Sequence, residues 1–197
     1  MAIAKNRTAS EIQQIMTEYK GVVKKSDFNA LLIALRCLNI LILGECGVGK
    51  TWTMKKLISH LECTEEKKIG LVRYRSNGRG VNVIGKYTGK TFDGSDALSM
   101  TVMNSLDLFL RRTKQDKLNV YEGQRFSNMK FIKKTKCLVF KIDGDGLQGR
   151  IKRMSEQKTT HLKRIASQVR NLEDTVDKHF KCSQDCYDHI LSLLEEA

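Results

Sequence analysis

The chain has 197 residues, of which 41% are hydrophobic, so it can bury a sizeable core and fits one α/β domain with small additions. Its 35 Lys and Arg residues against 22 Asp and Glu residues give a formal net charge of +13, which favours a polyanionic partner, most simply a nucleic acid. Its apolar runs are too short for a membrane span, its N-terminus lacks the apolar core of a secretory signal, and its six cysteines form no C-x-x-C pair, so we expect a cytoplasmic protein with free thiols.

Residues 8–36 are predicted to form two helices ahead of the main domain. Apolar residues recur at helical spacing in both halves of this stretch, and Gly21 separates the halves. Ser26 is a good N-cap for the second helix. We therefore divide the chain into an N-terminal helical extension, residues 1–36, and a main domain, residues 37–197.

The main domain opens with a phosphate-binding motif between a strand and a helix. Residues 38–43 (LNILIL) are typical of a buried strand, and residues 52–61 carry apolar side chains at helical spacing. Residues 44–51 (GECGVGKT) match the P-loop pattern G-x-x-x-x-G-K-[ST] in full. Glycines in such a loop turn backbone N–H groups toward phosphate oxygens, and the following helix adds its positive N-terminal end. We predict binding of ATP and Mg²⁺, with Lys50 at the β- and γ-phosphates and Thr51 on the metal. The predicted ATP-binding residues here are Gly44, Glu45, Cys46, Gly47, Val48, Gly49, Lys50, Thr51 and Trp52.

The rest of the domain alternates between strands and helices. After the P-loop helix, the pattern predicts a strand at 68–75, a long loop with five glycines at 76–95, a helix at 96–112 and a strand at 118–123. A short helix starting near Arg125, a strand at 136–143, a basic helical lid within about 144–178, a short strand at 179–182 and a final helix capped by Ser183 follow. This order predicts an α/β fold of the P-loop kinase type, a three-layer sandwich with a mostly parallel sheet and helices on both faces.

Other P-loop classes fit less well. Asp143 to Gly146 matches the D-x-x-G turn of GTPases and Thr113 to Asp116 matches T-K-x-D, but the two occur in the reverse order and the second closes a helix. A ring ATPase or helicase needs a longer core than this chain offers. A small phosphotransferase fits, because the chain has candidates for an acceptor site after the second strand, an acid on the third, and a basic lid.

Three further blocks of sequence follow the P-loop. They are VIGKY at 83–87 with FDGSDALSM at 92–100, VYEGQRFSN at 120–128, and the basic stretch HLKRIASQVRNL at 161–172. With these blocks the chain resembles the P-loop kinases with which bacteriophages phosphorylate 5-hydroxymethyluracil bases in DNA during hypermodification. The resemblance covers about residues 38–195 and leaves out the N-terminal 36.

The resemblance implies transfer of the γ-phosphoryl of ATP to the hydroxymethyl group of that base, in the cytoplasm of a phage-infected bacterial cell. It implies that Glu122 supports Mg²⁺ with Thr51, and that Asp93 or Asp96 accepts the proton of the acceptor hydroxyl; the sequence leaves that choice open. Gln124 and Ala97 stand where the family has Asp and Arg. Glu122 must then carry the metal role, and the missing arginine must be replaced by Arg79, Lys90 or Arg125. Lid candidates for the transferring phosphoryl are Arg150, Lys152, Arg153 and Lys163, of which we assign Arg150 and Arg153 to ATP binding.

Two other functions stay open at this stage. One is a P-loop kinase for free deoxynucleotides, which needs a compact acceptor pocket and no large positive charge. The other is a non-catalytic ATP-dependent DNA-binding protein. A DNA kinase must reach a base by flipping it out of the duplex, and Tyr74, Tyr87 and Phe92 are candidates for stacking on that base.

Overall fold

The computed structural model describes residues 38–88, 93–143 and 156–195. The expected N-terminal extension, Lys90, Phe92 and the first part of the expected lid, with Arg150, Lys152 and Arg153, lie outside the described residues. Within the described chain, no helix is both long and apolar enough to cross a membrane.

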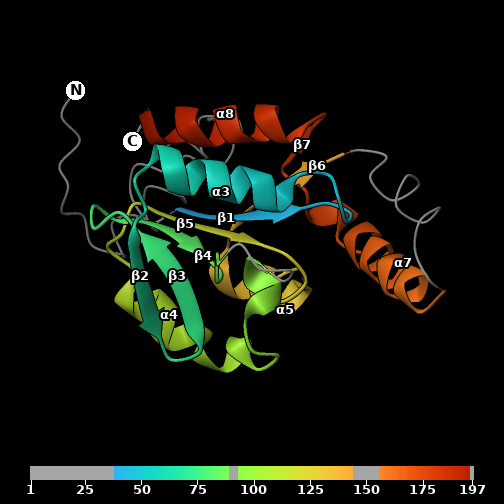
Figure 1. The fold of residues 1–197 in the computed structure, drawn as a ribbon, viewed down its shortest axis with the longest axis horizontal. Coiled ribbons are helices and arrows are strands. Elements are labelled where there is room, and N and C mark those ends of the chain that lie inside the picture. Colours follow the sequence, from blue (N-terminus) through green and yellow to red (C-terminus); the bar gives the residue numbers. More distant parts are fainter. Residues whose placement is uncertain (1–37, 89–92, 144–155, 196–197) are drawn as a thin grey trace, which may run out of the picture.

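A seven-stranded sheet in the order β2-β3-β4-β5-β1-β6-β7 forms the centre of the molecule (Figure 1). Five neighbouring strands, from β4 to β7, are parallel, whereas β2 and β3 form an antiparallel hairpin at one end. The expected mostly parallel α/β sheet is therefore confirmed. The strands are β1 Leu38–Leu43, β2 Glu65–Ile69, β3 Val72–Ser76, β4 Val81–Ile84, β5 Leu118–Glu122, β6 Leu138–Ile142 and β7 Lys178–Phe180.

Helices cover both faces of the sheet, as expected for a three-layer sandwich (Figure 1). Residues of α3 and α8 pack with Ile40, Ile42 and Val120 on one face, and residues of α4 and α5 pack with Leu41, Leu43 and Tyr121 on the other. Alternate residues of each strand thus enter opposite cores. The helices are α3 Lys50–His60, α4 Leu106–Arg112, α5 Met129–Thr135, α7 Glu156–Arg170 and α8 Ser183–Glu195, with short 3₁₀ turns η1 Ser95–Ala97, η2 Val102–Ser105 and η3 Glu173–Thr175.

Three sequence predictions for residues 65–112 were wrong. The single strand expected at 68–75 is the β2–β3 hairpin, which turns at Gly70 with a φ of 60° that glycine adopts at little cost. The loop expected at 76–95 contains β4, whose four buried residues lie between glycines that suggested a loop. The helix expected at 96–112 is helical only in pieces, and α4 begins at Leu106.

Asparagines on three neighbouring strands form a buried polar ladder. Asn119 on β5 lies in register with Asn39 on β1 and Asn82 on β4. Its amide donates to the Asn39 Oδ1 and Thr113 Oγ1 atoms, each at 3.2 Å, and its Oδ1 accepts from Asn82 at 2.9 Å. Asn82 also donates to Asp116 at 2.6 Å, which fixes the loop between α4 and β5 to the start of the sheet.

We expect Asn119→Ala to lower the free energy of unfolding by about 2 kcal/mol, because it leaves buried partners of the ladder without a hydrogen bond. Urea denaturation measures this loss. Asn104→Ala, at an exposed position on η2, is the control and should change stability by less than about 0.5 kcal/mol. Equal stability of the two variants would contradict a structural role for the ladder.

Candidate active site

The P-loop lies where the order of the parallel strands reverses. After β1 the chain continues to β2, on the β4 side of the sheet. After β5 it crosses to β6, on the other side. Because β1 and β5 are adjacent, the loops that follow them separate at their carboxyl ends, and such points are where open α/β sheets bind ligands. The loop after β1 is the predicted P-loop, and the loop after β5 carries residues 123–128.

The motif glycines are required by close packing of the backbone. Gly44 has a φ of 148°, and a Cβ added there would lie 2.9 Å from the carbonyl oxygen of Ile142. Gly49 has a φ of 99°, and a Cβ there would lie 2.7 Å from Ser183, the first residue of α8. The loop after β7 therefore closes one side of the P-loop, a contact that the local pattern of the sequence does not reveal.

Lys50 begins α3 and its side chain folds back over the loop. Its Nζ donates to the carbonyl oxygens of Gly44 at 2.6 Å and Glu45 at 2.7 Å. The ammonium group is thus held over the concave side of a glycine-rich turn, where P-loop lysines meet phosphate. Cys46 and Val48 lie in the same turn, and Trp52, with 45% of its surface exposed, follows Thr51 on α3.

Glu122 faces Thr51 across the two central strands. It ends β5 in register with Ile42, and its Oε1 and Oε2 atoms accept from the Thr51 hydroxyl at 3.2 and 3.3 Å. Only 3% of its surface is exposed. Burial, reinforced by Asp96 and Asp93, raises the pKa of Glu122 to about 7, although Lys50 and the Thr51 hydroxyl act in the opposite direction.

A hydroxyl and a carboxylate in contact fit a magnesium site. Both are hard oxygen donors, and Mg²⁺ in nucleotide sites takes one or two such side chains with waters and phosphate oxygens. Among the described residues, no group of three or more His, Cys, Asp or Glu side chains is arranged as a closed metal site. Thr51 and Glu122 are the residues that would hold the metal, through the oxygen atoms that contact each other.

The two candidate bases lie beside Glu122 but differ in their partners. The Asp93 carboxylate accepts from the Thr88 amide at 2.8 Å and pairs with Lys55 at 2.7 Å, and only 7% of its side chain is exposed. Asp96 is exposed and accepts from the Gln124 amide at 3.3 Å. Asp93 therefore holds its loop against α3, whereas Asp96 keeps a carboxylate open at the carboxyl edge.

Gly94 and Ser95 bring this loop onto Glu122. A Cβ added at Gly94, whose φ is 76°, would lie within 2.3 Å of the Glu122 Oε1 atom. The Ser95 hydroxyl donates to the main-chain oxygen of Glu122. Sequence reasoning did not assign a role to Gly94, Ser95 or Lys55; the position of Lys55, four residues after Thr51 on the same helix face, was the available signal.

The basic candidates separate into near and far residues. Arg125 follows β5 at the carboxyl edge, and its Nε donates to the Leu98 carbonyl at 3.4 Å. It therefore lies near residues 93–96, the predicted acceptor loop. Arg79 lies before β4, at the opposite edge of the sheet, where it pairs with Glu62 at 2.9 Å. The prediction that Arg79 could replace the family arginine, absent here at Ala97, was therefore wrong. Lys163 is exposed on α7.

The aromatic candidates for base stacking are structural where they are described. Tyr74 is buried in the core with its ring edge-on to Phe109. Tyr87 packs against Gly85 and Gly94, and its hydroxyl donates to the Ile84 carbonyl at 3.3 Å. The prediction of base stacking was therefore wrong for Tyr74. The contacts of Tyr87 show that its ring supports the acceptor loop.

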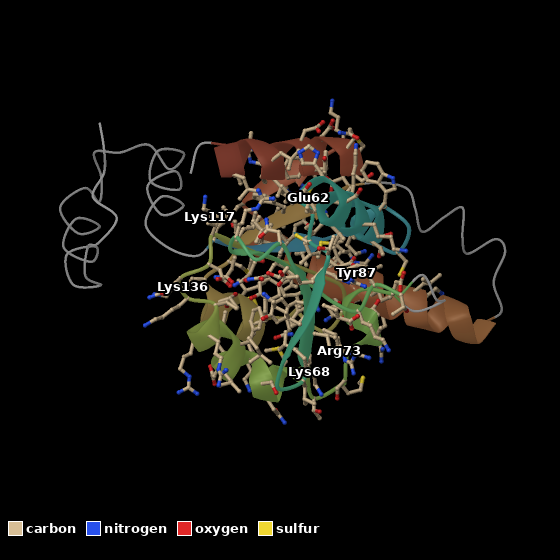
Figure 2. All side chains as sticks on the ribbon, turned by 60° about the vertical axis from the view of Figure 1, so that its left-hand side comes forward. Glu62, Lys68, Arg73, Tyr87, Lys117 and Lys136 are labelled. Atoms are coloured by element: carbon tan, nitrogen blue, oxygen red, sulfur yellow. The ribbon has the colours of Figure 1, made fainter. Side chains whose placement is uncertain are left out.

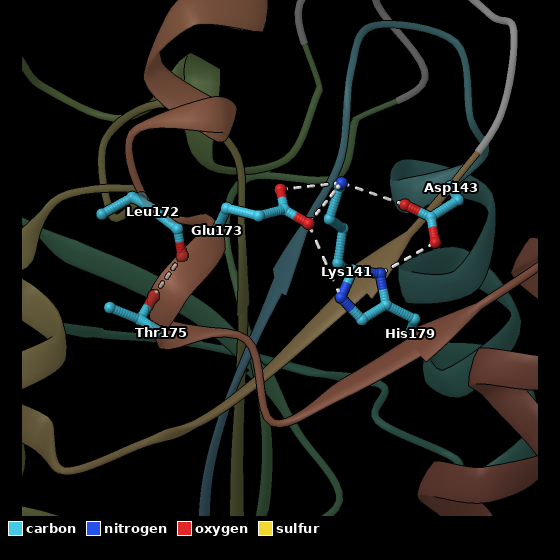
Figure 3. A network of polar contacts seen from close by, with 6 residues as sticks. All are labelled: Lys141, Asp143, Leu172, Glu173, Thr175 and His179. Atoms are coloured by element: carbon cyan, nitrogen blue, oxygen red, sulfur yellow. Dashed lines mark hydrogen bonds and ion pairs between the residues drawn. The ribbon is translucent and has the colours of Figure 1, made fainter.

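Asp143, the first residue of the D-x-x-G match, belongs to a polar network at the end of β6 (Figure 3). Lys141 pairs with Asp143 at 3.1 Å and with Glu173 at 2.9 Å, and His179 contacts Asp143 at 2.9 Å. Partial burial works against ionisation of Asp143, but hydrogen bonds from His179 and Lys141 outweigh it and lower the pKa. The network joins residues just before the expected lid, Lys141 and Asp143, to residues near its end, Glu173 and His179.

Among the described residues, five cysteines are not joined in disulfide bonds: Cys46, Cys63, Cys137, Cys182 and Cys186.

Comparison with solved structures finds distant similarity. No family model matches the chain, and no curated protein matches it. Among solved structures, the crystal structure of shikimate kinase from Aquifex aeolicus vf5 is similar, with 14% sequence identity and a TM-score of 0.39, over 80% of this chain and 96% of that chain. A TM-score this low supports no conclusion about function.

The raised pKa of Glu122 predicts a pH-dependent stability. Between the usual carboxyl pKa of 4.5 and about 7, the folded chain holds a proton on Glu122 that the unfolded chain has lost. The free energy of unfolding should therefore fall as pH rises through this window, by about 3 kcal/mol for this group. Urea denaturation of the wild type and Glu122→Gln at pH 4.5 to 8 measures it. The Gln variant should gain stability relative to the wild type as pH rises, and parallel curves would contradict the assignment.

Close packing at Gly94 predicts that Gly94→Ala weakens Mg²⁺-dependent ATP binding at least about tenfold, because the added methyl displaces the Glu122 carboxylate. Fluorescence of Trp52, the single tryptophan, measures binding. Gly78→Ala is a matched control: its φ of 69° is similar, but it lies at the opposite edge of the sheet, beside Glu65. An equal loss of ATP affinity in both variants would show that backbone strain, and not the contact with Glu122, causes the loss. Unchanged affinity of Gly94→Ala would contradict the prediction.

Proposed function

We propose that the chain is an ATP-dependent phosphotransferase that acts on a hydroxyl acceptor. The observation that carries this proposal is the contact between Thr51 and the buried Glu122 at the ends of adjacent strands, with the P-loop on one side and the Asp93–Asp96 loop on the other. A nucleotide-binding protein without catalysis needs the P-loop but no second carboxylate beside the metal-binding acid. A kinase needs both.

Each group then has a task in the transfer. The P-loop amides and Lys50 hold the phosphates, and Thr51 and Glu122 would hold Mg²⁺, which would neutralise phosphate charge. The acceptor oxygen forms a bond to the γ-phosphorus as the bond from that phosphorus to the ADP oxygen breaks. The acceptor proton passes to a carboxylate within reach of the hydroxyl.

We assign the role of proton acceptor to Asp96. Its carboxylate is exposed at the carboxyl edge, whereas the Asp93 carboxylate is engaged by Lys55 and the Thr88 amide. Asp93 is instead a positioning residue that fixes the acceptor loop on α3. Arg125, from the loop after β5, is the described cation best placed to stabilise the transferring phosphoryl group.

For the acceptor, we propose the hydroxymethyl group of 5-hydroxymethyluracil in DNA. Support comes from the resemblance of residues 83–100, 120–128 and 161–172 to phage kinases of that specificity, and from the net charge of +13, which exceeds what ATP requires. A kinase for free nucleotides would not need this charge.

The test is transfer of label from γ-labelled ATP with Mg²⁺. The acceptors are duplex DNA containing hydroxymethyluracil, ordinary duplex DNA and free deoxynucleotides, with Lys50→Ala as the inactive control. Label in the modified duplex alone supports the proposal. Label in free nucleotides identifies a nucleotide kinase, and ATP binding with no transfer to any of these acceptors contradicts both kinase assignments.

With the labelled acceptor in hand, Asp96→Asn should lower kcat at least about 100-fold with the KM for ATP nearly unchanged, because it removes the proton acceptor alone. Asp93→Asn should lower kcat less and raise the KM for the acceptor, because it loosens the loop. Steady-state kinetics on both substrates separates the two effects. The reverse pattern would assign the base to Asp93.

A further inference from the structure

Residues 106–136 carry a large share of the positive charge of the chain. Residues 106–136 contain nine Lys and Arg against three Asp and Glu, so these 31 residues carry +6 of the net +13. One of the three acids is the buried Glu122. The other two are engaged: Asp107 pairs with Lys134 at 2.6 Å, and Asp116 accepts from Asn82.

Most of these cations lie at the amino edge of the sheet. Helices α4 and α5 each lead into the start of a parallel strand, so their last turns lie at the edge opposite the P-loop. In Figure 2, Lys117 and Lys136 lie together on one side of the molecule, and Tyr87, which supports the acceptor loop, lies on the other. We call the exposed residues Arg111, Arg112, Lys114, Lys117, Lys133 and Lys136 the basic edge.

Helix dipoles explain only part of this cluster. Arg111, Arg112 and Lys133 lie in last turns, where a cation is favoured by the carbonyl ends of the helix. Lys114, Lys117 and Lys136 lie beyond the helices, and the dipole effect falls off within the last turn. Their presence on one edge needs another reason.

The surface of the basic edge is firmly supported and hollowed. The asparagine ladder holds Thr113 and Asp116, so the loop that carries Lys114 and Lys117 is fixed to the sheet from both ends. The amide of Lys117 also donates to the Gly80 carbonyl at 2.8 Å. An open hollow of about 520 Å³, lined by Asp107, Leu110, Arg111 and Lys114, lies on the α4 side of this surface.

We infer that the basic edge binds the phosphate backbone of duplex DNA, at a site separate from the catalytic edge. The choice of DNA rests on the proposed function; the site itself rests on the charge and support of this surface. Exposed lysines and arginines on a fixed base bind phosphates without reading sequence. The surface would therefore hold the duplex while the opposite edge reaches a base.

The experiment measures DNA affinity by fluorescence anisotropy against salt, without ATP. The probe is an unmodified duplex of about 20 base pairs. Lys114→Ala with Lys133→Ala should lower affinity at least about tenfold at low salt and reduce the slope of log K against log salt by about 2, since each lysine that contacts phosphate contributes about 1. The control, Lys67→Ala with Lys68→Ala on β2, removes the same charge from a strand where these lysines follow Glu65 and Glu66.

Unchanged slope in the basic-edge variant, equal loss in both variants, or no binding of duplex by the wild type would overturn the inference. Transfer to modified DNA that is unaffected by the basic-edge variant would overturn it while leaving the proposed function intact. Duplex binding that depends on the basic edge, in a protein that transfers no phosphoryl group, would support the inference and contradict the function.

Discussion

The contact between the Glu122 carboxylate and the Thr51 hydroxyl determines how the rest of the site is arranged. It forms because β5 lies directly beside β1, so the last residue of one strand meets the start of the helix that follows the other. Burial makes the charge of this carboxylate costly, and Lys50 offsets only part of that cost. A divalent cation bound beside the carboxylate would offset this cost, so the buried charge of Glu122 is consistent with the proposed metal site.

The loop of residues 93–96 depends on that same carboxylate. Gly94 lies so close to Glu122 that no side chain fits between them, and Ser95 donates to the Glu122 main chain. Asp93 then reaches Lys55 on the P-loop helix, and Asp96 reaches the Gln124 amide after β5. The P-loop side of the site and the loop of residues 93–96 thus both contact Glu122. In the proposed phosphotransferase this shared contact would hold the two substrates at a defined distance.

The sequence predicted the strand and helix around the P-loop, whereas it missed β4 and the β2–β3 hairpin, for physical reasons. Residues 44–51 specify their own conformation, because glycine positions, the preceding apolar strand and the following helix all act locally. Glu122 was predicted from the acid at the end of the expected strand 118–123 and from the resemblance of residues 120–128 to the phage kinases. The hairpin at Gly70 was missed because its first strand, EEKKI, is charged and exposed. Strand β4 was missed because its four residues lie between glycines and pair with β5, far along the chain. The sequence could not separate Asp93 from Asp96, because their contacts with Lys55, the Thr88 amide and the Gln124 amide form only in the fold.

The two edges of the parallel sheet carry different groups in this chain. Strand ends, helix N-termini and the buried acid lie at the carboxyl edge, whereas the last turns of α4 and α5 with their lysines and arginines lie at the amino edge. A strand of five residues spans about 17 Å. That length corresponds to about five base pairs of a duplex at 3.4 Å each. A duplex held by phosphates at the amino edge and running along α4 and α5 would therefore bring a base a few pairs away to the catalytic edge. If the chain acts on DNA as proposed, one bound duplex would span the distance from the basic edge to Glu122, so that a single substrate would occupy both edges of the sheet.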